Sequence, residues 1–316
     1  MLSRLVFALV TLLPQTPSSP QAAPPTCERV AVLGASVSAG FGLMGEVGSP
    51  VTLASFLRLA LGSQSKEVKG FGDTMLFQDP LKLGPQQIDK AVVSDPTLVI
   101  AIDFAFWYGY GFLPSCKGRL ELLQRCLDQL ERISCPLLLG DFPDMTPALL
   151  GKSALLGGKP MLAPQQIPDA ACMRKLNEHL RQWAAKRPNV HVFPLSTFVA
   201  EVAREGTFEF RGIRYDTQQK SGMLQSDLLH PTIRGTVAAT WYILHILAEK
   251  GWLDAQSVSW DPRKLEQEIF ASTQGARDKA EQKRRKREQR KADRKAKKKA
   301  QQDPKQGADL FCPLPQ

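Results

Sequence analysis

The sequence lacks most of the features that mark membrane proteins, metalloproteins and nucleotide-binding proteins. Beyond the amino terminus, no segment approaches the ~18 consecutive apolar residues that a membrane-spanning helix needs. Only four of the 316 residues are histidine, and no Cys/His cluster has the spacing of a zinc site. The apolar run at residues 29–33 is followed neither by the GxGxxG fingerprint of a dinucleotide site nor by the lysine of a phosphate-binding P-loop. The 43% of hydrophobic and 8% of aromatic residues exclude a fibrous or wholly disordered protein.

The body of the chain also lacks net charge, although the whole chain carries +10. Residues 277–300 contain 14 Lys and Arg against four Asp and Glu, and the rest of the chain holds 27 of each sign. From Ala276 to Ala308 the only apolar residue is alanine, so a helix there has no apolar face to pack. The sequence predicts a neutral domain at residues 28–260 and a basic, low-complexity tail at 261–316 that is disordered or partly helical.

Residues 1–23 resemble a secretory signal peptide. Arg4 supplies a short positive start, the run from Leu5 to Leu13 is apolar but too short to cross a bilayer, and a segment rich in Pro, Ser and Gln follows. Residues 24–27 are then a linker, and we expect an exported protein, either periplasmic or extracellular. The alternative is that the apolar run forms a buried first strand.

The chain has six cysteines, which allow up to three disulfides in any of 15 connectivities. Whether paired or free, they are expected to be structural, and the sequence does not identify the pairs: Cys27, Cys116, Cys126, Cys135, Cys172 and Cys312.

Short apolar runs alternate with helical patterns from Glu28 to about Asp254. The runs at 29–33, 97–102 and 136–139 do not alternate with polar residues, which is typical of strands buried on both faces, and a weaker strand is expected at 190–193. Apolar stripes predict amphipathic helices between and after them. This alternation predicts an α/β fold with a mostly parallel sheet between layers of helices.

A serine follows the first expected strand, in the segment Gly34-Ala35-Ser36-Val37-Ser38. In an open parallel sheet, ligands bind at the carboxyl ends of the strands, and glycine lets the backbone turn sharply there. The segment is not the GxSxG elbow of α/β-hydrolases, because position 38 is serine rather than glycine. Alone, a Gly/Ser turn after a strand is more often just an ordinary turn.

The segment Asp227-Leu228-Leu229-His230-Pro231 places a carboxylate and an imidazole three residues apart. Asp227 can then accept the Nδ1 proton of His230, which leaves Nε2 as a base, and Pro231 is expected to open the next helix at its first position. A lone histidine is more often a capping or buried residue. The pairing with Asp227 and the serine turn far upstream distinguish His230 from the other three histidines.

Together these motifs resemble the SGNH (GDSL-type) hydrolase superfamily over roughly residues 28–250. The resemblance implies a flavodoxin-like three-layer α/β/α fold, with Ser36 as nucleophile, His230 as base and Asp227 as the carboxylate that orients it. Asn177 and the strand expected at 190–193 also resemble the stretch before the family's DxxHP motif. The resemblance implies no metal and no organic cofactor.

The chain departs from the family pattern at two positions. Ala35 stands where the family's GDS motif has aspartate, and Ala105 stands where its GxND motif has an asparagine that donates to the oxyanion. The resemblance implies two further donors to the oxyanion hole, the backbone N–H of Ser36 and that of either Gly70 or Gly72. Losing one of three donors costs about a hundred- to a thousandfold in rate unless another group replaces it.

An aromatic cluster follows the third expected strand, near the predicted edge of the site. Its members are predicted to line an acyl or sugar pocket, with ordinary core packing as the alternative: Phe104, Phe106, Trp107 and Tyr108.

The predicted function is an exported serine esterase that hydrolyses a small acyl ester or an acylated carbohydrate through an acyl-enzyme on Ser36. The alternative, favoured by Ala105, is a catalytically weak or inactive protein of this fold that binds an acylated or anionic cell-surface polymer. The basic tail is predicted to contact an anionic polymer or lipid, or only to keep the chain soluble. Nucleic-acid binding is disfavoured because the basic stretch of the tail, residues 276–308, has no interleaved aromatic residues for base stacking.

Overall fold

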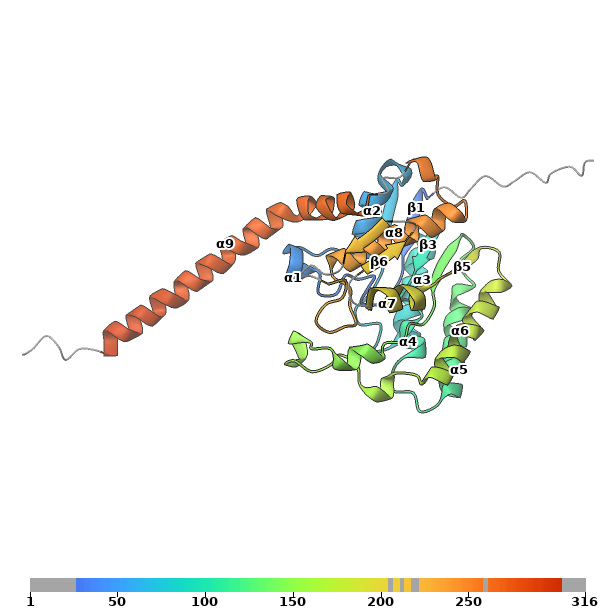
Figure 1. The fold of residues 1–316 in the computed structure, drawn as a ribbon, viewed down its shortest axis with the longest axis horizontal. Helices are drawn as coiled ribbons and strands as arrows, with labels where there is room; N and C mark the ends of the chain where they lie inside the picture. The colour runs from blue at the N-terminus through green and yellow to red at the C-terminus, as the bar shows by residue number, and fades with distance from the viewer. Residues whose placement is uncertain (1–26, 204–206, 211–212, 217–221, 258–260, 303–316) are drawn as a thin grey trace, which may run out of the picture.

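The computed structural model describes residues 27–203, 207–210, 213–216, 222–257 and 261–302 (Figure 1). Its centre is a five-stranded sheet with strand order β2-β1-β3-β4-β5, in which all the neighbouring strands pair in parallel. The strands are β1 (Arg29–Val32), β2 (Glu67–Gly70), β3 (Leu98–Ala101), β4 (Leu137–Gly140) and β5 (Val190–Phe193). The predicted α/β/α fold is confirmed, and the strand order is that of flavodoxin-like folds.

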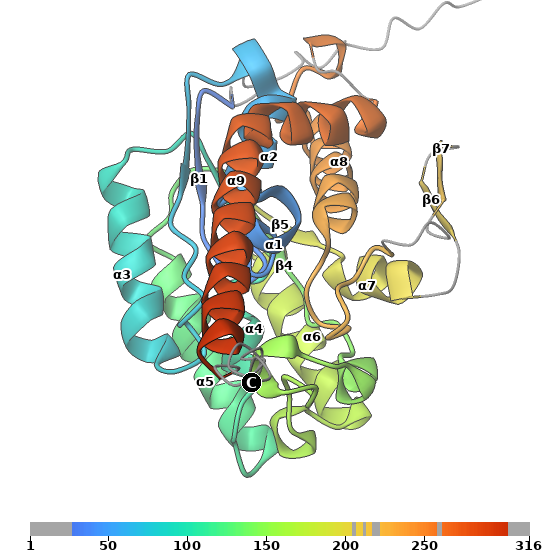
Figure 2. The same cartoon turned by 90° about the vertical axis from the view of Figure 1, so that its left-hand side faces the viewer.

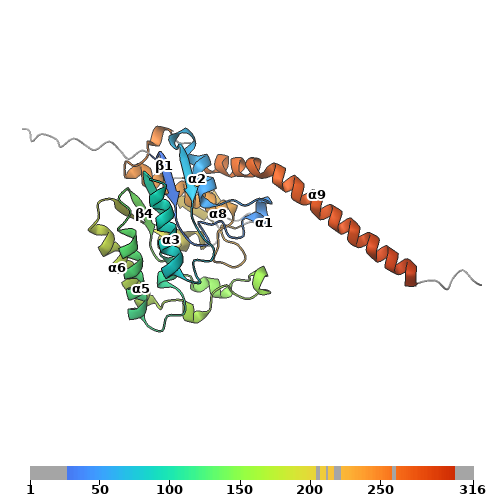
Figure 3. The same cartoon turned by 180° about the vertical axis from the view of Figure 1, so that it is seen from behind.

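Helices cover both faces of the sheet (Figures 1 and 3). One core holds α2 (Leu53–Leu61) and α8 (Ile233–Glu249), and the other holds α3 (Pro80–Val93), α5 (Cys116–Leu130) and α6 (Ala170–Ala185). Neighbouring residues of β1 divide between the two cores, because successive side chains of a strand point to opposite faces. Both faces are therefore buried, which explains the continuous apolar runs of the central strands.

Polar side chains fix where four of these helices begin. The N-cap residues of α3, α5, α6 and α8 each accept a hydrogen bond from a backbone N–H of the first turn: Asp79, Ser115, Asp169 and Thr232. Shorter elements complete the body: α1 (Met44–Val47), α4 (Phe106–Gly109), α7 (Leu195–Ala203), and the antiparallel pair β6 (Thr207–Phe210) and β7 (Ile213–Asp216).

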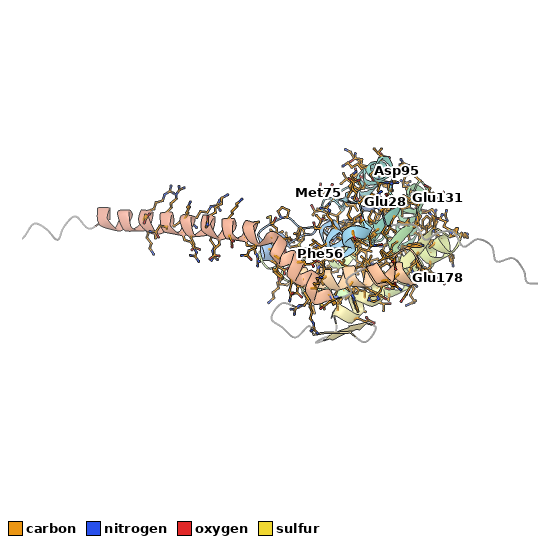
Figure 4. The ribbon with its side chains drawn as sticks, turned by 90° about the horizontal axis from the view of Figure 1, so that it is seen from above. Glu28, Phe56, Met75, Asp95, Glu131 and Glu178 are labelled. Atoms are coloured by element: carbon orange, nitrogen blue, oxygen red, sulfur yellow. A yellow bond between two sulfur atoms is a disulfide. The ribbon has the colours of Figure 1, made fainter. Side chains whose placement is uncertain are left out.

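The last helix, α9 (Pro262–Gln302), packs on the body at one end and projects from it at the other (Figures 1 and 2). Its first turns lie against α1, α2 and α8, where Leu265 and Ile269 are 6% and 1% exposed. The described side chains after residue 277 are exposed and stand out from the ribbon (Figure 4). The predicted tail is thus helical to residue 302, and its first turns dock because Leu265 and Ile269, four residues apart, share a face.

One disulfide, Cys116–Cys172, joins the beginnings of α5 and α6 with a Cα–Cα distance of 5.4 Å. Of the other cysteines, Cys27, Cys126 and Cys135 are free thiols, and Cys312 lies outside the described residues. Burial raises the pKa of Cys27 to about 12 and that of Cys135 to about 11, which keeps both thiols protonated near neutral pH.

The helices of the described ranges include none that is long and apolar enough to cross a bilayer. Within the same ranges, no group of three or more His, Cys, Asp or Glu side chains is arranged to hold a metal ion. The signal peptide predicted at residues 1–23 lies outside the described part of the chain, and so does the predicted linker except for Cys27.

Candidate active site

Ser36 lies in a tight turn at the carboxyl end of β1. The turn begins at Gly34, which has a φ of +156° and sits so close to Asp103 that a Cβ would lie 2.0 Å from the carboxylate Oδ1. Only glycine fits there. The Phe41 N–H donates to the Ser36 carbonyl at 2.9 Å and closes the turn. The serine is therefore held at the sheet edge where parallel α/β folds bind their ligands.

The imidazole of His230 lies between a carboxylate and the Ser36 hydroxyl. Its Nδ1 is 2.7 Å from Oδ2 of Asp227, and its Nε2 is 2.9 Å from Oγ of Ser36. Asp227 and His230 are only 4% and 2% exposed. With the Nδ1 proton donated to the carboxylate, Nε2 is free to accept the proton of the serine hydroxyl.

The contacts of Asp227 keep its carboxyl ionised. Burial acts to raise its pKa, but the hydrogen bond and charge of His230, together with the backbone N–H groups of His230 and Leu229, outweigh burial and lower the pKa below 3.8. Both of those N–H groups lie 3.0 Å from Oδ1. An ionised Asp227 holds the His230 tautomer that leaves Nε2 unprotonated.

Local packing fixes the turn that carries this pair. Leu228 adopts a left-handed φ of +53°, which folds the chain so that Asp227 and His230 face each other. The Gln225 N–H donates to the His230 carbonyl at 2.8 Å, and the Phe41 ring lies 4.3 Å from the imidazole. The base is thereby held against rotation away from Ser36.

The predicted position of Pro231 is wrong by two residues. Helix α8 begins at Ile233, and its N-cap is Thr232, whose hydroxyl accepts from the Gly235 N–H at 3.1 Å. Pro231 precedes that cap instead of occupying the first helical position. The hydroxyl of Thr232 sets the boundary because it accepts a hydrogen bond from a first-turn N–H that has no acceptor within the helix.

Two backbone N–H groups in or near the nucleophile turn have no acceptor among the described residues, those of Ser36 and Gly72. Gly72 packs against the turn, since a Cβ there would lie 3.0 Å from the Cβ of Ser38. Gly70 is instead the last residue of β2, where a Cβ would lie 3.1 Å from that of Ala54 in α2. The structure packs Gly72, but not Gly70, against the nucleophile turn.

Ala105 precedes α4 and is 2% exposed. Its methyl group cannot donate a hydrogen bond, so the side-chain donor of the family pattern is missing here. Of the three donors that the resemblance implies, the backbone N–H groups of Ser36 and Gly72 remain as candidates.

A small pocket of about 50 Å³ opens beside Ser36. Phe106 and Trp107, two of the predicted aromatic residues, line it. The other lining residues come from the nucleophile turn, the ends of β3 and β4, α7 and the turn before His230: Ala35, Val37, Asp103, Pro143, Met145, Leu195, Val199 and Leu229. Since nearly all of these side chains are apolar, the pocket suits an apolar group next to the reacting atom.

The prediction of a pocket role is wrong for Phe104 and Tyr108. Both are buried in the core against α3, where a Cβ on Gly84 would lie 1.9 Å from the Tyr108 hydroxyl oxygen. That hydroxyl donates to the Pro80 carbonyl at 2.6 Å. Phe104 and Tyr108 are four residues apart and share the core side of this segment, while the other two aromatic residues of the cluster line the pocket.

Asp103 is a buried carboxylate beneath the nucleophile turn, and it is 4% exposed. Its Oδ1 accepts from the Ser38 hydroxyl at 2.5 Å, and its Oδ2 accepts from the backbone N–H of Val37 at 2.9 Å and of Ser38 at 3.1 Å. Burial raises the pKa of Asp103, and these hydrogen bonds oppose that rise. Sequence reasoning missed this residue, because nothing in the chain marks which backbone an aspartate after a strand will contact.

Asn177 and Asp141 hold the loop after β4. The Asn177 amide accepts from the Phe142 N–H at 2.7 Å and donates to the Phe142 carbonyl at 2.9 Å, while Asp141 accepts from the Ser196 N–H at 2.7 Å. Neither side chain contacts Ser36. They position a loop that contributes two residues to the pocket.

Several solved structures are similar to this chain over about 70% of its length. They include the lipase/acylhydrolase from Enterococcus faecalis (15% identity, TM-score 0.44, covering 71% of this chain and 96% of that one) and the psychrotrophic esterase EstA from Pseudoalteromonas sp. (14%, 0.43, 70% and 97%). A catalytic mutant of an acetylxylan esterase from Geobacillus stearothermophilus is similar at 13% identity and a TM-score of 0.43, covering 72% and 97%. No family model matches the chain, and no curated protein does.

Proposed function

We propose that the chain is a serine ester hydrolase of the SGNH (GDSL-type) class that forms an acyl-enzyme on Ser36. The observation that carries the proposal is the unbroken series of contacts from Asp227 through His230 to Ser36, at 2.7 and 2.9 Å. A histidine with a purely structural role does not need a serine hydroxyl at its second nitrogen. The arrangement is that of a carboxylate, a base and a nucleophile in series.

In this mechanism the Ser36 oxygen attacks the carbonyl carbon of the ester as its proton passes to Nε2 of His230. Ionised Asp227 stabilises the imidazolium that forms. The imidazolium then gives its proton to the departing alcohol, and the C–O bond of the ester breaks to leave the acyl-enzyme. Water deprotonated by His230 attacks the acyl-enzyme, which releases the acid and restores the serine.

The negative charge of each tetrahedral intermediate is placed on the side of Ser36 that faces Gly72. The free N–H groups of Ser36 and Gly72 support this assignment, because preorganised backbone donors stabilise an oxyanion without reorganising during the reaction. Two donors of this kind are fewer than the family's three. We expect a lower rate than a complete oxyanion hole would give.

The pocket beside Ser36 argues for a short acyl group. A cavity of about 150 Å³ in a protein core holds one benzene molecule, and this pocket has about one third of that volume. An acetyl group or a chain of a few carbons fits, whereas a long acyl chain does not. A sugar ring is too large and too polar for this lining, so a carbohydrate would have to be the alcohol side of the ester.

A catalytically weak binding protein is the second candidate, and Ala105 is the observation that favours it. Without a side-chain donor to the oxyanion, the same residues could hold an acylated ligand with little turnover. The complete Asp227, His230 and Ser36 series favours the enzyme, because binding alone does not use a nucleophile and a base in contact.

We also propose that the protein is exported, on the strength of the signal-like residues 1–23. The disulfide between Cys116 and Cys172 supports this, because disulfides persist mainly in oxidising compartments.

The test is hydrolysis of p-nitrophenyl acetate by the full chain beside Ser36→Ala and His230→Ala. We expect turnover by the wild type and a loss of about a thousandfold or more in kcat for each variant. Phe112→Ala is the matched control, since Phe112 is 74% exposed and does not line the pocket. Equal activity in wild type and Ser36→Ala, or no turnover of any short acyl ester, would contradict the proposal.

A further inference from the structure

One side of the projecting part of α9 carries cations and no acidic residue. At about 100° per residue, five cations fall within an arc of about 100°, and we name them the cationic face: Lys283, Arg287, Arg290, Lys291 and Arg294. Four of these side chains line one surface groove. The acidic residues of this part of the helix all lie outside the arc: Asp278, Glu281, Glu288 and Asp293.

The cationic face is free to bind a partner. Its five side chains are exposed, and no described group forms an ion pair or hydrogen bond with any of them. The ion pairs of this stretch, Arg284 with Glu288 and Arg285 with Glu281, lie beside the face rather than on it. From Lys283 to Arg294, at 1.5 Å per residue, the face extends for about 17 Å.

We propose that the cationic face binds a linear anionic polysaccharide, and that the acyl esters cleaved at Ser36 are carried by such a polymer. The substrate half of this inference rests on the ester hydrolysis proposed above. A row of fixed cations complements a polymer that repeats its negative charge along its length. Residues 276–302 have no apolar side chain larger than alanine to enter a lipid layer and no aromatic ring to stack on a base. This segment can therefore attract a partner only through its charge.

The cationic face starts near the edge of the body that holds the nucleophile turn. Gly48, directly after α1, packs so closely on α9 that a Cβ there would lie 3.1 Å from Cα of Arg277. Helix α1 itself follows the Ser36 turn along the chain, and α9 is in contact with α1. Lys283 lies about 9 Å farther along the helix than Arg277. A polymer held on α9 therefore runs toward the body on the α1 side, and its short acyl groups match the pocket beside Ser36.

The binding test uses the full chain and polygalacturonate as the probe. The variant R287Q/R290Q/R294Q neutralises the cationic face, and R285Q/K286Q/K295Q removes the same charge from outside it. At about 50 mM salt we expect the first variant to lose tenfold or more in affinity and the second about threefold or less, with wild-type binding falling steeply toward about 200 mM salt. Equal losses in both variants, or no wild-type binding, would overturn the proposal. Tighter binding to duplex DNA or to phosphatidylglycerol vesicles at equal charge would overturn the choice of polymer.

The substrate test compares acetylated polygalacturonate with neutral acetylated xylan. We expect the wild type to favour the anionic polymer about tenfold in kcat/KM at low salt, and R287Q/R290Q/R294Q to lose that preference while it cleaves p-nitrophenyl acetate at the wild-type rate. An equal rate on both polymers contradicts the substrate assignment and leaves ester hydrolysis intact. No turnover of p-nitrophenyl acetate contradicts the proposed function and with it the substrate assignment, while the binding test still decides the role of the cationic face.

A second inference concerns Asp103, and it rests on contacts that do not involve α9. We infer that Asp103 is a positioning residue that sets the place of Ser36 through Val37 and Ser38, without acting on the substrate. Its two oxygens accept three hydrogen bonds from the residues that directly follow the nucleophile. Gly34 at the start of the turn also packs on this carboxylate, since a Cβ there would lie 2.0 Å from Oδ1 of Asp103. A displacement of about 1 Å in a reacting group can cost a hundredfold in rate.

Asp103→Ala and Asp103→Asn separate positioning from charge. Asp103→Ala removes every acceptor, and we expect kcat on p-nitrophenyl acetate to fall tenfold or more with KM within about twofold. Asp103→Asn keeps an oxygen for the two backbone N–H groups, and its amide can donate to the Ser38 hydroxyl, which then donates to the Leu33 carbonyl at 3.1 Å. The asparagine variant should therefore recover most of the lost kcat.

Two results would overturn the positioning role. One is wild-type kcat in Asp103→Ala, and the other is an asparagine variant as slow as the alanine variant, which would make the charge the important property. If Asp103→Ala does not fold, Ser38→Ala serves instead, because it removes one of the three hydrogen bonds; we expect a severalfold loss in kcat, and an unchanged kcat would contradict the inference.

Discussion

Ser36 lies between a proton-transfer side, which has every group the proposed mechanism needs, and an oxyanion side, which lacks one of the donors that the resemblance implies. On one side, Asp227 and His230 form a buried chain of contacts, and both carboxylate oxygens of Asp227 accept hydrogen bonds. On the other side, the proposed oxyanion donors are the backbone N–H groups of Ser36 and Gly72 alone, because the methyl group of Ala105 cannot donate a hydrogen bond. The proton-transfer side depends on side chains and the oxyanion side on backbone geometry. Substitution of Asp227 or His230 should therefore abolish activity, whereas a substitution at Ala105 that adds a donor can raise it.

The largest effect should come from the proton-transfer side. Asp227→Asn keeps the shape of the side chain but offers an N–H to Nδ1 of His230, which favours the tautomer with a proton on Nε2. We expect kcat on p-nitrophenyl acetate to fall by about a thousand- to ten-thousandfold. Circular dichroism checks that the variant is folded. A loss of less than about tenfold would mean that Asp227 does not orient the base.

Ala105→Asn tests the oxyanion side in the opposite direction. The substitution adds the side-chain donor that the family pattern has, and one such donor is worth about a hundred- to a thousandfold in a well-formed site. Because Ala105 is buried and the larger side chain must find space, we expect a gain of about tenfold in kcat. Ala105→Leu, of similar size but without a donor, should give no gain. Equal rates in the two variants would show that no donor is missing at this position.

Gly72→Ala and Gly70→Ala distinguish the two glycines. A Cβ on Gly72 meets the Cβ of Ser38 at 3.0 Å, so the nucleophile turn must shift, and we expect kcat to fall about tenfold. A Cβ on Gly70 meets Ala54 at 3.1 Å, so that variant should lose thermal stability with little change in kcat. Steady-state kinetics and thermal melts of both variants check the pair. A larger kcat loss in Gly70→Ala would reverse the assignment.

The smallest predicted effect concerns acid stability. The pKa of Asp227 is lowered in the folded state, so its ionised form stabilises the fold above the unfolded pKa of about 3.8, and this contribution is lost as the pH falls through the folded pKa. The difference in free energy of unfolding between the wild type and Asp227→Asn should therefore be larger near pH 7 than near pH 3. Urea unfolding at both pH values measures it. A difference that grows in acid would contradict the direction of the shift.

Much of the proton-transfer side could be predicted from the sequence. Ser36 follows a strand whose apolar run is easy to recognise, and Asp227 and His230 occur within one short motif. Such elements are local, so neighbouring residues determine them. The shape of the sheet was also predictable, because strands buried on both faces give unbroken apolar runs. The edge strand β2, with the polar pattern Glu67–Gly70, carries no such signal.

The oxyanion side and the pocket could not be predicted as fully, because they depend on contacts between distant segments. Only the folded chain shows that Gly72 rather than Gly70 packs on the nucleophile turn, or that Asp103 accepts its N–H groups. The aromatic cluster divides between pocket and core according to the turn of α4, which its uniformly apolar sequence does not indicate. The docking of α9 rests mainly on Leu265 and Ile269, which are buried, with Phe270 partly buried against the same core.

The central claim is that Ser36 carries the acyl group during turnover, and trapping that intermediate tests it most directly. The full chain is mixed with p-nitrophenyl acetate, quenched in acid and digested for peptide mass spectrometry. For the wild type, the account predicts an acetyl group on the peptide that contains Ser36. In His230→Ala this acetyl group should form much more slowly, and in Ser36→Ala it should be absent. Turnover with no acetyl on that peptide, or the same acetylation in Ser36→Ala, would contradict it.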